Sequence, residues 1–132
     1  MQGGKPRPTT VLLIVAGLGG VLLGVIGLRY LLVPESAART FGVPGRPLGH
    51  ELYYIVGLRN LWLGALAIGL AALRHWHGLA LWFATGMVVC FADALIAATA
   101  TGKPPQVAFH VLYGCLCALL AALCWGRARK GR

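Results

Sequence analysis

The sequence predicts an all-α, polytopic membrane protein built as a bundle of four transmembrane helices. Of its 132 residues, 58% are hydrophobic and only 11% are charged, whereas a soluble domain carries about 25% charged residues. Four apolar runs are each long enough to cross a bilayer, which takes about 20 residues of helix. Residues 1–132 are therefore predicted to form one membrane domain that crosses the cell membrane several times.

The first predicted span covers residues 11–33 and follows a short polar segment with Lys5 and Arg7. A signal peptide is the alternative, because a small-x-small pattern follows at Ser36–Ala38. The apolar run is longer than the roughly 7–15 residues of a signal peptide's apolar region. A retained membrane span is the preferred interpretation.

Four glycines recur inside this span at alternating steps of three and four: Gly17, Gly20, Gly24 and Gly27. Small residues at this spacing form one stripe and let two helix backbones approach closely. We expect the stripe to make a tight helix contact within the bundle, or otherwise with a second copy of the chain or a membrane partner.

The connection at residues 34–50 is predicted to be a surface loop or a short helix. Pro34 and Glu35 suit a first helical turn, and Gly42 suits a helix stop. Residues 43–47, with two prolines and a glycine, are predicted to form a turn.

Three further spans are predicted at about 51–73, 79–101 and 107–125. The connections between them are short, which favours antiparallel packing of consecutive helices. We therefore expect each of these helices to lie beside the next one in the chain.

The charge distribution predicts the orientation. Twelve Lys and Arg residues face three acids, a formal net charge of +9. Most basic residues fall on the side of the membrane that receives both termini and the 74–78 connection: Lys5, Arg7, Arg74, Arg127, Arg129, Lys130 and Arg132. The positive-inside rule then predicts that both termini are cytoplasmic. Basic residues at the ends of spans favour a membrane surface over nucleic acid as the partner, and no nucleic acid is expected.

Two charges lie inside the predicted spans. Arg59 follows Glu51 by eight residues and Asp93 precedes Thr101 by eight residues. At a rise of 1.5 Å per residue, both lie about 12 Å from the same, outer surface. Charges at such depth usually pair or face a cavity. We expect Arg59 and Asp93 to form an ion pair between the second and third spans.

A wider set of polar side chains is predicted to share this outer half. Asp93 and His110 are candidate catalytic groups, because a carboxylate and an imidazole can act as general base and acid. The candidate ligand-binding residues are Glu51, Tyr53, Arg59, Asn60 and Tyr113. Together they indicate a polar pocket that opens to the outer leaflet.

The cysteines and histidines show no metal-ligand spacing, so no metal site is predicted. Cys90, Cys115, Cys117 and Cys124 all fall inside predicted spans, where cysteine commonly behaves as a small hydrophobic residue. Cys90 and His110 differ in depth by about 9 Å, which is beyond the reach of a Cys–His nucleophile.

Three segments resemble a known family. They read PESAARTFGV at 34–43, YYIVGLRNLWLG at 53–64 and FADALI at 91–96. The chain is similar here to small four-helix membrane proteins of actinobacteria and fungi that are catalogued as a domain of unknown function. Many of those proteins have aspartate after the arginine, where this chain has Asn60. A weaker likeness to DoxX-like membrane proteins lies in size and layout. The resemblance implies the fold and the polar set, and no reaction.

The leading functional hypothesis is binding of a small amphiphilic or apolar ligand, such as an isoprenoid, quinone or polyketide, in the outer-half pocket. The sequence names no cofactor. The alternative is a structural or accessory subunit in which Arg59–Asp93 only fixes helix register. A small transporter is less favoured, because transporters of this size rely on an acid in their first span and this span has none.

Overall fold

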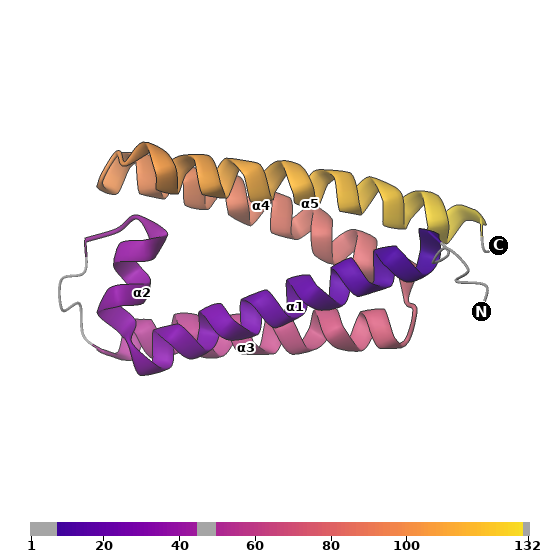
Figure 1. The fold of residues 1–132 in the computed structure, drawn as a ribbon, viewed down its shortest axis with the longest axis horizontal. Coiled ribbons are helices and arrows are strands. Elements are labelled where there is room, and N and C mark those ends of the chain that lie inside the picture. The colour runs from indigo at the N-terminus through magenta and orange to yellow at the C-terminus, as the bar shows by residue number, and fades with distance from the viewer. Residues whose placement is uncertain (1–7, 45–49, 131–132) are drawn as a thin grey trace, which may run out of the picture.

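The computed structural model describes residues 8–44 and 50–130 and confirms the all-α prediction. The helices are α1 (Pro8–Leu32), α2 (Pro34–Phe41), α3 (His50–Ala72), α4 (Trp76–Ala100) and α5 (Pro104–Lys130). The four long helices lie along the long axis of the molecule, and α2 crosses one end (Figure 1). The start of α1 and the end of α5 lie together at the other end, which we call the termini end.

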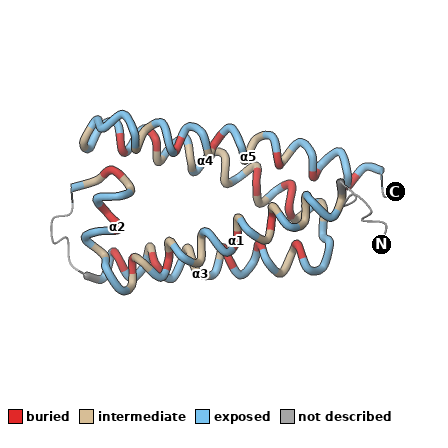
Figure 2. Tube along the Cα trace, in the orientation of Figure 1, coloured by how far each residue is buried: buried red, intermediate tan, exposed pale blue. Residues whose placement is uncertain are grey.

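Four helices are long and apolar enough to span a membrane: Thr9–Leu32, Glu51–Ala72, Trp76–Ala100 and Pro104–Lys130. This confirms the four predicted spans. These helices carry exposed large apolar side chains, such as Leu18, Leu95 and Leu112, as lipid contact requires. Figure 2 shows exposed residues along the length of the long helices. The helix α5 continues past the predicted end at Trp125. Its last turn carries Arg127, Arg129 and Lys130. Positive charges at this position stabilise a helix, because its C-terminal end is the negative end of the helix dipole.

The helices α1 and α3 pack along their length as an antiparallel pair. A Cβ added to Gly20 would lie 2.7 Å from the carbonyl oxygen of Gly64, and one added to Gly27 would lie 2.6 Å from that of Gly57. The backbones therefore touch at two levels, as the glycine stripe predicts for a contact within the bundle. At Gly17 and Gly24 an added Cβ would meet nothing within 4 Å.

The helices α4 and α5 form the second pair. Leu79, Phe83, Leu120 and Cys124 are buried between them, in a cluster that also contains Ala16 of α1 and Ala71 of α3. Because Ala16 and Ala71 lie near the termini end, this cluster joins the two pairs there.

The expected packing of α3 against α4 is wrong for most of their length. Each packs instead on another helix, α3 on α1 and α4 on α5, and the two pairs diverge away from the termini end (Figure 1). The physical reason is close packing at glycines, since α3 presents Gly57 and Gly64 to α1. In lipid, helices associate largely through van der Waals attraction, which is strongest where two backbones approach closely.

The short helix α2 is as predicted. Pro34 begins it, and Gly42 ends it with a left-handed backbone (φ 109°) whose N–H donates to the carbonyl of Ala38 at 3.1 Å. Ala37 and Ala38 are buried in a cluster with Tyr30 and Tyr53. The predicted turn at 43–47 falls mainly on residues 45–49, which lie outside the described residues.

Candidate functional site

The α2 end of the bundle holds a buried pair of tyrosines. Tyr30 of α1 and Tyr53 of α3 are each 6% exposed, and their ring centroids are 6.2 Å apart. Tyr53 belongs to the predicted site, whereas Tyr30 was not predicted. Gly20 lies against Gly64 and Gly27 against Gly57. The same antiparallel register places residue 30 beside Tyr53, so a correct pairing of these glycines would have predicted Tyr30 as part of the site.

Asp93 interacts electrostatically with one side chain from each of the other three long helices. Asp93 of α4 interacts electrostatically with His110 of α5 and with Arg59 of α3. Tyr30 of α1 also interacts with Asp93. Asp93 therefore interacts with two of the predicted residues, Arg59 and His110, and with Tyr30 of the tyrosine pair.

The predicted Arg59–Asp93 ion pair is absent from the described part of the chain. The ion pair that the structure shows there joins Arg39 and Glu35 on α2, at 3.8 Å. Arg59 is exposed and Asp93 is half-buried, and they interact only at longer range. The reason is the helix pairing: α3 and α4 belong to different pairs, so their facing side chains are separated at this level.

His110 has a structural role. It is 8% exposed, and its Nε2 lies 2.9 Å from the carbonyl oxygen of Phe41. A carbonyl oxygen only accepts, so Nε2 carries the hydrogen and donates it. The Phe41 ring lies against the imidazole, with centroids 4.5 Å apart.

A second side chain holds the end of α2 in the same way. The Thr101 hydroxyl donates to the carbonyl oxygen of Gly42 at 2.7 Å. The last carbonyls of a helix have no partner within the helix. Thr101 and His110, from the α4–α5 end, therefore cap α2 and tie it to the second helix pair.

The remaining predicted residues lie around this centre. Glu51 is exposed in the first turn of α3, and Asn60 is half-buried. Tyr113 is half-buried and packs on Phe109, with ring centroids 4.5 Å apart. In the described ranges, no hydrogen bond or ion pair joins these three side chains to Arg59, Asp93 or His110.

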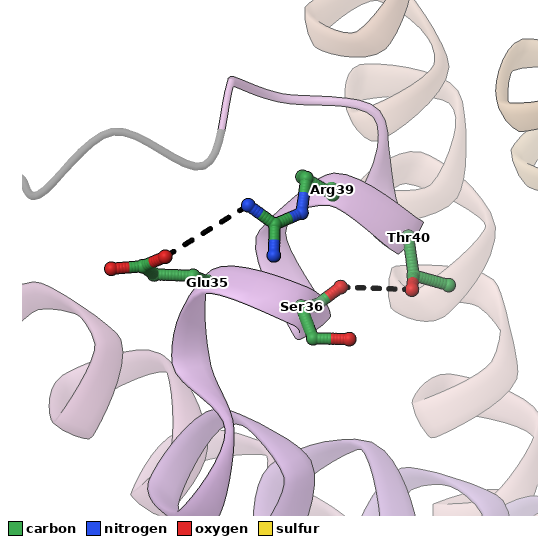
Figure 3. A network of polar contacts seen from close by, with 4 residues as sticks. All are labelled: Glu35, Ser36, Arg39 and Thr40. Atoms are coloured by element: carbon green, nitrogen blue, oxygen red, sulfur yellow. Dashed lines mark hydrogen bonds and ion pairs between the residues drawn. The ribbon is translucent and has the colours of Figure 1, made fainter.

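The outer face of α2 carries its own polar network. Thr40 donates to the carbonyl of Ser36 at 2.9 Å and accepts from Arg29 at 3.1 Å. Figure 3 shows two contacts within α2, the Arg39–Glu35 ion pair and the Thr40–Ser36 hydrogen bond. This network links the end of α1 to α2.

Two shallow hollows flank α2. One, of about 360 Å³, is lined by Val33, Pro34, Glu35, Ser36 and Arg39. The other, of about 200 Å³, is lined by Thr40, Pro105, Gln106 and Phe109. Neither contains a predicted site residue. Since these hollows are surface features of the α2 corner, the convergence of charges at Asp93 is the better guide to a functional site.

The thiols show an arrangement that the sequence did not predict. Cys117 of α5 faces α4, since its Sγ lies 3.7 Å from the position of a Cβ added to Gly86. Within the described ranges, no group of three or more His, Cys, Asp or Glu residues could hold a metal ion.

Comparison with known proteins gives one family match, which covers all of the predicted site residues. No curated protein and no solved structure matches the chain. A family model matches residues 20–124, a range that contains every predicted site residue and most of the four spans. The chain therefore belongs to the family described as Domain of unknown function (DUF4267).

Proposed function

We propose that this integral membrane protein binds a small amphiphilic or apolar molecule between its two helix pairs at the α2 end, with the polar group of that molecule on Arg59. The observation that carries the proposal is an exposed arginine inside a membrane span with no direct ion pair in the described residues. Placing such a charge at the centre of a span costs about 2.5–3.5 kcal/mol on insertion scales. A ligand carbonyl, hydroxyl or acid would offset that cost.

The surroundings of Arg59 support a ligand with one polar end. Asp93 and His110 of the second helix pair interact with each other, and Asp93 also interacts with Arg59. The long exposed faces of the helices are apolar. An isoprenoid, a quinone or a polyketide has this combination of an apolar body and a polar group.

Acid–base chemistry at the site would use Asp93 first. Its carboxylate is half-buried and close enough to interact with both His110 and Arg59. His110 already donates Nε2–H to Phe41, so only its Nδ1 could exchange a proton with a ligand without releasing α2. Asp93 is therefore the candidate base, and His110 is the candidate acid in its imidazolium form, in which Nδ1 also carries a proton.

The proposed site opens to the outer side of the membrane. Arg74, Arg127, Arg129 and Lys130 lie in the helix connection and helix end that form the termini end. The positive-inside rule puts that end in the cytoplasm. The α2 end, with Glu35, Glu51 and Asp93 nearer to it, then faces outward.

The test is mass spectrometry of small molecules that copurify with the protein from native membranes in mild detergent. The variant is Arg59→Gln, and the matched control is Arg127→Gln, which removes an exposed arginine at the termini end. We expect a molecule that the wild type and the control retain and that Arg59→Gln retains at least tenfold less. Each variant is first shown to be monodisperse by size-exclusion chromatography.

Equal retention by Arg59→Gln, or no retained molecule in the wild type, would refute ligand binding at Arg59. A membrane protein recovered in stoichiometric amount in place of a small molecule would instead favour an accessory subunit. The direct Arg59–Asp93 pair on which that alternative relied is not formed in the described residues.

A further inference from the structure

At the termini end, a row of contacts joins the start of α4 to the end of α5. The ring of His77 meets the ring of Trp125 nearly edge-on, at 80° and with centroids 5.8 Å apart. The Cζ atom of Arg129 lies over the same Trp125 ring, 5.9 Å from its centroid. A guanidinium over an indole is attracted by the electrons of the ring face. Trp125 therefore orients Arg129 and connects it to His77 on the neighbouring helix.

The end of α5 that carries this row is packed on the bundle. Cys124 and Ala128, one turn apart, are both buried. Trp125 and Arg129 follow them by one residue each and lie together on one side of this buried stripe. Arg127 precedes Arg129 by two residues, which places it about 200° around the helix. The packing therefore determines which basic side chain of this turn lies beside Trp125.

The end of α5 also extends beyond the apolar core of a bilayer. The helix has 27 residues and is therefore about 40 Å long at a rise of 1.5 Å per residue. The hydrocarbon core is about 30 Å thick, and the headgroup regions bring the whole bilayer to about 40–45 Å. Tryptophan favours the level of the headgroups. Trp125, and Arg129 one turn beyond it, are therefore expected to lie at the level of the lipid phosphates.

No acidic side chain lies at this end of the protein. The chain has three acids in all. Glu35 and Glu51 lie in the first turns of α2 and α3, and Asp93 lies two turns before the end of α4. All three are therefore nearer the α2 end. A partner of opposite charge for Arg129 is expected to come from outside the chain.

Exposed apolar surface adjoins this charge on the side of the membrane. Leu81 follows His77 by one turn on the same face of α4, and both Leu81 and Trp125 are exposed. A small soluble anion would contact only the charge. A phospholipid would place its phosphate on Arg129 and an acyl chain along Leu81 and the Trp125 ring, and so would contact both surfaces.

We propose that His77, Trp125 and Arg129 form a binding site for one anionic phospholipid at the membrane surface of the termini end. The planar guanidinium donates two hydrogen bonds to the phosphate, and a ring N–H of His77 donates a third. The positive-inside rule puts this end in the cytoplasm, where anionic lipids make the membrane surface negative. Arg59 lies in another helix, nearer the opposite end, so this proposal does not depend on the ligand proposed there.

The test is native mass spectrometry of the full chain in mild detergent with added dioleoyl phosphatidylglycerol. The variant is Arg129→Gln and the matched control is Arg127→Gln. Both remove one positive charge from the same turn, so a general attraction of anionic lipid to this basic end would fall equally in the two. We expect Arg127→Gln to bind about as much lipid as the wild type and Arg129→Gln about tenfold less, as for the loss of a hydrogen bond to a charged group.

Two variants test whether Trp125 orients the arginine. Trp125→Leu keeps an apolar side chain but removes the ring, and it should bind as little phosphatidylglycerol as Arg129→Gln. Trp125→Phe keeps a ring under the guanidinium and should bind nearly as much as the wild type. Each variant is first shown to be monodisperse by size-exclusion chromatography. Because Arg127 and Arg129 are both exposed, their comparison stands even if a variant at Trp125 folds poorly.

Two further additions identify the ligand. Dioleoyl phosphatidylcholine has the same acyl chains and phosphate but no net charge, and it should bind much less than phosphatidylglycerol. Glycerol 3-phosphate has the phosphate without acyl chains, and at equal concentration it should leave the bound phosphatidylglycerol in place.

Equal binding of phosphatidylglycerol by Arg129→Gln and Arg127→Gln would overturn the proposal, because the lipid would then respond to the total charge and not to a site on Trp125. Equal binding of the two phospholipids would also overturn it. Displacement by glycerol 3-phosphate would mean that the site takes a soluble phosphate in place of a lipid. Wild-type binding by Trp125→Leu would show that the indole does not orient Arg129.

Discussion

Gly27 of α1 and Gly57 of α3 bring two helix backbones into direct contact, since a Cβ added to Gly27 would lie 2.6 Å from the Gly57 carbonyl oxygen and 2.9 Å from the Leu61 nitrogen. The obstacles are backbone atoms, which cannot move aside as a side chain can. Gly27→Ala should therefore separate α1 from α3 and cost about 1–3 kcal/mol, the usual effect of overpacking. The measurement is the thermal unfolding midpoint of the purified protein in detergent.

Gly17→Ala is the matched control for this substitution. It changes the same residue type on the same glycine stripe, but an added Cβ there meets nothing within 4 Å. Alanine is favoured over glycine inside a helix by about 1 kcal/mol, so Gly17→Ala should leave the midpoint unchanged or raise it. A Gly27→Ala protein as stable as Gly17→Ala would contradict the close packing of α1 and α3.

Arg59→Leu tests whether the arginine contributes to stability or only to binding. Breaking a buried ion pair by removing one partner costs about 3–5 kcal/mol. Arg59 has no such direct partner in the described residues, so in ligand-free detergent Arg59→Leu should unfold at or above the wild-type midpoint. A stable protein that has lost its ligand would show the trade between stability and function expected of a binding site. A large drop in the midpoint would instead reveal a direct pair with Asp93.

Thr101→Val tests the attachment of α2. The Thr101 hydroxyl donates to the Gly42 carbonyl at 2.7 Å, and valine keeps the shape but removes the donor. The carbonyl left without a partner should cost about 1–3 kcal/mol and should loosen α2 in particular. Hydrogen–deuterium exchange of the peptide that contains α2 is expected to rise, while peptides from the α1–α3 contact stay protected.

The control for Thr101→Val is Thr99→Val. The Thr99 hydroxyl donates only within its own helix, to the carbonyls of Leu95 and Ile96 at 3.0 and 3.1 Å. Those carbonyls keep their helical hydrogen bonds when the hydroxyl is removed. Exchange in α2 should therefore match the wild type, and equal exchange in both variants would mean that Thr101 does not hold α2.

The features that could be predicted from the sequence are those encoded locally. The four spans follow from hydropathy, α2 follows from Pro34 and Gly42, and the close contact of the first span follows from the spacing of Gly20 and Gly27. Each depends on residues within one helix or at its ends, so the rest of the fold does not alter them.

The pairing of helices could not be predicted in this way. Short connections and the matching depth of Arg59 and Asp93 favour packing of α3 beside α4. However, two charges at the same depth in the membrane do not show that their helices are neighbours. The deciding contact joins Gly57 and Gly64 of α3 to glycines of α1, far away in the sequence. Because the pairing was wrong, the direct ion pair was wrong as well, although Asp93 does interact electrostatically with Arg59 and with His110.

The role of His110 shows why site residues are harder to predict than spans. The sequence presents an imidazole near a membrane surface, which fits an acid or a base equally well. Only the return of α2 across the bundle brings the Phe41 carbonyl to within 2.9 Å of Nε2. That contact spans 69 residues of chain, and no local pattern encodes it.

A comparison of His110→Gln with His110→Ala separates the capping of α2 from any proton transfer. A glutamine amide can donate a hydrogen bond to the Phe41 carbonyl but does not exchange protons near neutral pH, whereas alanine does neither. His110→Ala should therefore destabilise the protein by about 1–3 kcal/mol and raise exchange in α2, and His110→Gln should remain close to the wild type in both measurements. Any loss of ligand retention in His110→Gln then reports on the site itself, because the fold is kept. If His110→Gln exposes α2 as much as His110→Ala does, the hydrogen bond to Phe41 is not what holds α2. The tilted contact between the Phe41 ring and the imidazole, with centroids 4.5 Å apart, must then hold it.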